Sequence, residues 1–87
     1  MFWKTKSPQQ KLQEEIAEMY QSTVNLALNQ SSEPFMKATY VRMAIQTCND
    51  TAKSKVGLLA KKYNLSEGIV WSIIVDSNKS AIEYFIK

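Results

Sequence analysis

The chain contains no histidine and a single cysteine, Cys48. These absences exclude histidine-based metal sites and the disulfide frameworks that stabilise many small domains. Serine and cysteine nucleophiles lack a histidine base, and the only two glycines stand eleven residues apart, too sparse for a phosphate-binding loop. The sequence therefore predicts a protein that is not an enzyme and has no metal, no cofactor and no evident small-molecule substrate. We expect Cys48 to be a small buried apolar residue.

Glycine and proline are also scarce, which favours long helices joined by short turns. Ser7 and Gln10 flank Pro8 in the pattern of a capping box, and this predicts a first helix that starts there and ends near Asn29. Its apolar face recurs at helical spacing. The residues of this face are Leu12, Ile16, Met19, Thr23, Leu26 and Gln30. Glu14 and Glu18 lie on the opposite side, where we interpret them as solvated surface rather than a metal site.

Pro34 predicts the start of a second helix, because a proline suits the first helical turn. The apolar phase then continues through Val56 to Tyr63, and two interpretations stay open. Either one helix runs from 34 to about 63, or Asp50 or Thr51 caps a third helix after a tight break. The unbroken phase slightly favours the continuous helix, with a kink allowed.

After Asn64, Ser66 is the expected N-cap of a helix from 67 to about 76. The polar cluster 76–78 predicts a further stop, followed by a short C-terminal helix. A strand over 69–75 is the competing prediction, since β-branched and aromatic residues dominate there, but no partner strand is visible. We predict an all-α fold: a small bundle of four to five helices forming one domain over 1–87, with 1–6 as an N-terminal arm.

Long apolar runs are absent as well. The longest, from Ile69 to Val75, is interrupted by Ser72 and falls far short of the ~20 residues that a membrane span requires. The N-terminal residues do not form a signal peptide pattern, and a lone cysteine suits a reducing compartment. These observations predict a cytoplasmic protein.

Residues 59–74 resemble the helix-turn-helix motif of DNA-binding proteins. Ala60, Asn64, Leu65, Val70 and Ile73 stand where that motif has its small residue, turn residue, following hydrophobic residue and two core aliphatics. The resemblance implies a helix-turn-helix-like corner near residues 56–75. It departs from the motif in the second helix, which has no cation or amide side chain over 67–75 for reading base edges.

Charge is concentrated in the middle of the chain, where residues 37–65 carry six basic side chains and one acidic one. Four lysines are the predicted phosphate contacts if the partner is nucleic acid. They are Lys53, Lys55, Lys61 and Lys62. The alternative is an ordinary solvated helix face.

The helix that contains 69–75 is apolar all round, so it is either the hub of the core or an interface between chains. Tryptophan is enriched in binding hot spots, which makes Trp71 the expected anchor. The predicted interface residues are Trp71, Ile69, Ile74, Phe2 and Trp3. An apolar fraction of 45% in 87 residues favours self-association, because so short a chain has little interior.

Taken together, these features predict a small non-enzymatic interaction or regulatory protein. It would bind a macromolecular partner through apolar and basic surface, as a homodimer. The alternative is a helix-turn-helix-like DNA-binding regulator that uses residues 53–75.

Overall fold

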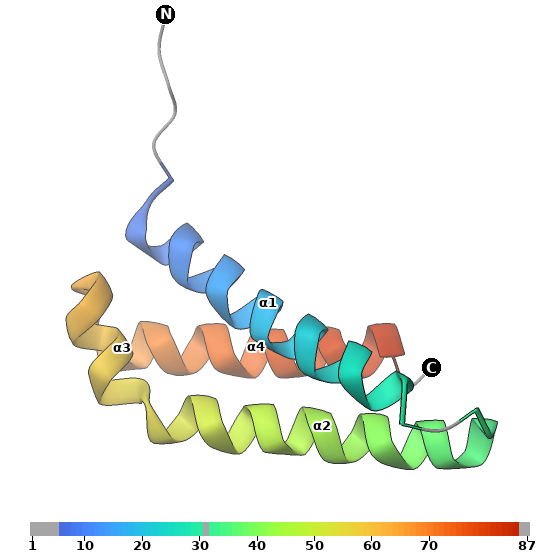
Figure 1. Cartoon of the computed structure of the whole chain (residues 1–87). Helices are drawn as coiled ribbons and strands as arrows, with labels where there is room; N and C mark the ends of the chain where they lie inside the picture. Colours follow the sequence, from blue (N-terminus) through green and yellow to red (C-terminus); the bar gives the residue numbers. More distant parts are fainter. Residues whose placement is uncertain (1–5, 31, 86–87) are drawn as a thin grey trace, which may run out of the picture.

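A computed structural model describes residues 6–30 and 32–85, which form four helices and no strand. The helices are α1 (Pro8–Leu28), α2 (Pro34–Ser54), α3 (Val56–Tyr63) and α4 (Glu67–Phe85). The helices α2 and α4 run alongside each other, α1 packs obliquely against them, and the short α3 lies at one end of the bundle (Figure 1). The predicted all-α class is confirmed, and the competing strand over 69–75 is wrong because that segment lies inside α4.

The start of α1 follows the pattern in the sequence. The Gln10 backbone N–H donates to Ser7 Oγ at 3.2 Å, and the Ser7 backbone N–H donates to Gln10 Oε1 at 3.0 Å. This reciprocal capping box satisfies two amides at the helix start, with Pro8 at the first helical position. The predicted start of α1 is therefore confirmed.

The second helix resolves differently from both sequence interpretations. It is continuous through residues 49–51 and ends at Ser54, so neither a cap at Asp50 or Thr51 nor a single helix to 63 is correct. Lys55 leaves helical geometry with φ −107° and ψ 8°. Buried Cys48 and Ala52 hold α2 on the core across 49–51, and the break at Lys55 redirects the chain so that Val56 is buried too.

The predicted stop at 76–78 is also wrong, because α4 continues without interruption to Phe85. The capping residues of that cluster offer the backbone only local hydrogen bonds, whereas continuing the helix buries Ala81 and packs Phe85 against the core. Tertiary packing of the later turns therefore outweighs the local preference. One long helix replaces the two short ones that the sequence predicts.

The core lies between α1, α2 and α4, and α3 covers one end of it. Every fully or nearly fully buried side chain in the described residues is apolar or a tyrosine. The largest side chains with under 2% exposure are Leu12 and Val24 of α1 and Val70 and Ile74 of α4. Cys48 is buried, as predicted. The core is thus built mainly from one face of each long helix.

Candidate interaction surfaces

The apolar helix of the sequence analysis is both a hub and a surface. On one side of α4, Val70 and Ile74 are 0% exposed, and Ile73 is also buried. Ile74 therefore belongs to the core of this chain, which corrects its assignment to the predicted interface. The opposite side of the same turns carries Trp71 and Val75 in contact with solvent.

The exposed apolar side chains of α4 form a continuous row. Trp71, Val75 and Ile82 are 41%, 55% and 43% exposed. Steps of four and seven residues place them on one side of a helix, with the neutral Asn78 between Val75 and Ile82. We call Trp71, Val75 and Ile82 the α4 stripe.

One border of the α4 stripe is set by α2. Lys53 Nζ lies 5.7 Å from the centroid of the Trp71 ring, within the range of a cation–π interaction. This contact joins the last turn of α2 to the first turns of α4. Trp71 therefore presents a partly covered ring with a cation at its edge.

The other predicted interface residues do not join this row. Ile69 is 36% exposed, but it lies two residues before Trp71 and so faces a different side of α4. Phe2 and Trp3 lie outside the described residues. Of the five residues predicted for the interface, the structure places Trp71 alone in the α4 stripe, and the sequence analysis missed Ile82 because it broke the helix at 76.

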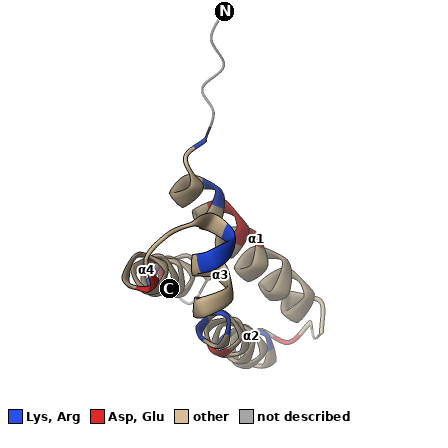
Figure 2. Cartoon of the chain, turned by 90° about the vertical axis from the view of Figure 1, so that its left-hand side faces the viewer, with Lys and Arg blue, Asp and Glu red and all other residues tan. Residues whose placement is uncertain are grey.

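The four predicted phosphate-contacting lysines lie at the α3 end of the bundle. Figure 2 views this end and shows basic residues on α3 and the adjoining end of α2, with acidic residues of α1 beside them. Lys53 contacts Trp71, and Lys62 Nζ pairs with Glu15 Oε1 at 3.0 Å. Lys55 at the α2–α3 break and Lys61 in α3 are exposed. Two of the four lysines are thus already engaged within the chain.

Glu15 ties α3 to α1. Its carboxylate accepts hydrogen bonds from the Tyr63 hydroxyl and from Lys62 Nζ. The hydrogen bond from Tyr63, followed by that from Lys62, lowers the pKa of Glu15 below its usual value of 4.5. This cluster contributes a tertiary contact rather than a reactive centre. Among residues 6–30 and 32–85, no three acidic, cysteine or histidine side chains are placed to hold a metal ion.

The turn between α3 and α4 has the geometry that the sequence suggests. Asn64 adopts φ 54° and ψ 48°, the left-handed conformation that asparagine tolerates better than most residues. The Leu65 backbone N–H donates to the Ala60 carbonyl at 2.9 Å, and Ser66 Oγ accepts from the Ile69 N–H at 3.2 Å. The predicted roles of Asn64 and Ser66 are confirmed.

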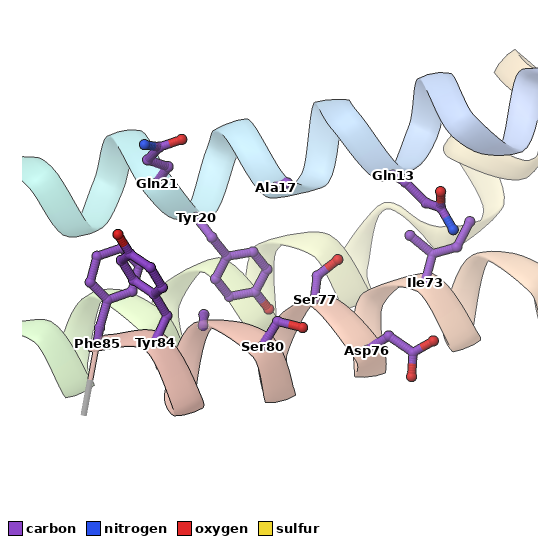
Figure 3. A pocket seen from close by; sticks show the side chains of 11 residues that line it. Gln13, Ala17, Tyr20, Gln21, Ile73, Asp76, Ser77, Ser80, Tyr84 and Phe85 are labelled. Atoms are coloured by element: carbon purple, nitrogen blue, oxygen red, sulfur yellow. The ribbon is translucent and has the colours of Figure 1, made fainter. Parts of the chain in front are cut away.

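A groove that the sequence analysis did not predict runs between α1 and α4. It encloses about 560 Å³ and opens to solvent. Its walls combine aliphatic, aromatic and polar side chains (Figure 3). The lining residues are Gln13, Ala17, Tyr20, Gln21, Ile73, Asp76, Ser77, Ser80, Ala81, Tyr84 and Phe85. The spacing of Ser77, Ser80 and Tyr84 would have indicated this face only if α4 had been expected to continue past 76.

Comparison with known protein families, with curated proteins and with solved structures finds no match to this chain. The functional argument therefore rests on the surfaces themselves. No helix in the described part of the chain has the length and apolar character needed to span a bilayer.

Proposed function

We propose that this protein is a non-enzymatic interaction module that associates with a second copy of itself through the α4 stripe. The observation that supports this most directly is the row formed by Trp71, Val75 and Ile82 on a helix that is held in the core by its buried face. Large apolar side chains that line up on one exposed helix face are typical of a surface that is covered by a partner. The rigid core side of α4 holds the row in place.

A second copy fits this row better than a polar partner does. In an antiparallel pairing about a two-fold axis, the two ends of the row exchange places, so Trp71 of one copy meets Ile82 of the other. Val75 then lies near the axis, because it stands close to the midpoint of the row. No ionised residue of α4 lies within the row, and the cation at its border, Lys53, lies at Trp71 and therefore at the ends of an antiparallel pair rather than at its axis.

The size of the row predicts a weak dimer. With the exposed fractions of 41%, 55% and 43%, the three side chains offer on the order of 250 Å² of surface, taking ~250 Å² for a whole tryptophan. A standard interface covers ~800 Å² per partner, so flanking polar residues must supply the rest. We expect a dissociation constant in about the micromolar to sub-millimolar range.

The test is the molar mass in solution, measured by light scattering over a concentration series for the wild type and for Val75→Glu. Val75 is more than half exposed, so a glutamate is tolerated in the monomer but places two like charges near the axis of the dimer. We expect the substitution to weaken dimerisation about tenfold or more while leaving the helical content unchanged.

Met43→Glu is the matched control. Met43 is 59% exposed on α2, and its helical position places it on the side of α2 opposite the buried Val41 and Ile45. It should leave the dimer intact. A wild type that stays monomeric up to millimolar concentration, or equal effects of the two substitutions, would refute the α4 stripe as a self-association surface.

A second candidate function is nucleic-acid binding through residues 53–75. The left-handed turn at Asn64, the exposed Lys61 in the last turn of α3 and the exposed Lys55 at the start of α3 favour this candidate. The exposed part of α4 offers no cation in residues 67–75 for base reading, so contacts would be to phosphate and independent of sequence. Binding to duplex DNA that weakens steeply with salt and is lost in Lys55→Gln/Lys61→Gln would support it, and absence of binding at low ionic strength would exclude it.

A further inference from the structure

The α1–α4 groove lies on a different side of α4 from the α4 stripe, so it is not explained by self-association. Its volume of about 560 Å³ lies within the range of sites that hold small organic ligands. The groove is lined by side chains from two helices that are both anchored in the core. It is therefore a preformed feature of the fold.

An unsatisfied polar group marks the middle of the groove. Tyr20 is only 2% exposed, and its buried hydroxyl has no hydrogen-bond partner in the described part of the chain. Figure 3 shows this side chain extending from α1 toward α4. A buried hydroxyl without a partner destabilises a fold, and this one lies directly beneath the groove.

The two ends of the groove differ in chemistry. One end carries Asp76, which is the only ionisable acid or base in the lining apart from the tyrosines. The other end carries Tyr84 and Phe85, whose rings pack edge to face with centroids 4.8 Å apart. Eight residues of helix separate Asp76 from Tyr84, which corresponds to about 12 Å.

These features together specify one class of ligand. We propose that the α1–α4 groove binds a small organic cation whose positive group lies at Asp76 and whose apolar or aromatic end lies at Tyr84 and Phe85. The middle of such a molecule lies over the side chain of Tyr20, whose hydroxyl is itself enclosed by the protein. An anion is disfavoured, because no cation lines the groove and Asp76 repels it.

The test uses N-benzyl-3-aminopropanamide, which has an ammonium group, a central amide and a benzyl ring along a chain of suitable length. Titration into the isotope-labelled full chain, followed by amide chemical shifts, gives both the position and the affinity of binding. We expect shifts that cluster at Tyr20, Ser77 and Tyr84, with a dissociation constant of about 1 mM or below. The charge-reversed analogue, N-benzylsuccinamic acid, should bind at least about tenfold more weakly.

Two variants test whether binding depends on the charge of Asp76 and on the open volume of the groove. Asp76→Asn should weaken the amine about two- to fivefold, as expected for an exposed ion pair, and should not weaken the neutral acetylated amine. Ala17→Leu fills the groove and should abolish binding. Glu83→Gln removes an exposed carboxylate from α4 outside the groove lining and serves as the control.

Three outcomes would overturn the proposal. One is equal affinity for the amine and its charge-reversed analogue, and another is equal weakening by Asp76→Asn and Glu83→Gln. The third is a set of shifts centred on Trp71 and Val75, which would show that the probe binds the apolar stripe instead. Unchanged amide spectra of the free variants establish that each one is folded, so a loss of binding can be assigned to the groove.

Discussion

Replacing Tyr20 with phenylalanine should stabilise this protein. The Tyr20 hydroxyl is buried and has no hydrogen-bond partner in the described residues, and its burial, with smaller contributions from Cys48 and Asp50, raises the pKa of the group to about 12. Leaving such a group unsatisfied costs about 1–3 kcal/mol, whereas a satisfied tyrosine loses about 0.5–1.5 kcal/mol when its hydroxyl is removed. The sign of the change therefore distinguishes the two situations.

We expect Tyr20→Phe to raise the free energy of unfolding by about 1 kcal/mol, which corresponds to an increase of roughly 4–8 °C in Tm for a domain of this size. Urea titration followed by circular dichroism at one fixed protein concentration provides the measurement, since dimerisation would otherwise change the apparent stability. Tyr84→Phe is the control, because Tyr84 is 80% exposed and should change stability by less than about 0.5 kcal/mol. A loss of stability in Tyr20→Phe would refute the reasoning and show that the hydroxyl has a bound partner.

Two further predictions concern the contacts of α3. Asn64→Gly should leave stability nearly unchanged, whereas Asn64→Ala should lower it by about 1 kcal/mol in the same urea assay, because alanine resists the left-handed backbone at φ 54°. Since Tyr63 and Lys62 lower the pKa of Glu15, its carboxylate stabilises the fold above pH 4.5 and loses this contribution as the pH falls through the lower folded value. Glu15→Gln should therefore lower stability at pH 7 by at most about 1 kcal/mol and should have a progressively smaller effect as the pH falls below 4.5, and a loss that stays constant with pH would contradict the assignment.

The predictable parts of the fold are those where local chemistry and packing agree. Ser7, Pro8 and Gln10 start α1 as their pattern indicates, and Ser66 caps α4 as expected. Asn64 adopts the left-handed conformation for an equally local reason, because its short polar side chain tolerates that backbone geometry. In each case the residues that decide the structure lie within a few positions of one another.

The errors fall where distant contacts decide the outcome. Nothing local ends α2 at Ser54, and the reason for the break is the burial of Val56 once the chain turns onto the end of the bundle. Likewise, the polar residues at 76–78 indicate a stop, but the burial of Ala81 about one turn later keeps α4 continuous. A single sequence shows the local preference without the packing partner that overrides it.

Because the sequence predicted a helix stop at 76–78, it did not predict most of the candidate surfaces. The sequence indicated Trp71 as an anchor, but Ile82 joins the same row only because α4 is uninterrupted. The groove depends on the helix in the same way, since Asp76 and Tyr84 form its two ends and lie about two turns apart on α4. A break at 76 would have separated both pairs.

The helix α4 therefore faces the core, the solvent and the groove with three different sets of residues. Val70 and Ile74 face the core, Val75 and Ile82 face solvent on one side, and the serines of the groove face α1 on the other. A helix that is buried on one side alone needs apolar residues on that side alone, so the additional apolar row on α4 adds nothing to the stability of a monomer. Exposed apolar surface of this kind lowers solubility unless a partner covers it, whereas exposed lysines are ordinary on a solvated helix, so the α4 stripe is the stronger indication of function.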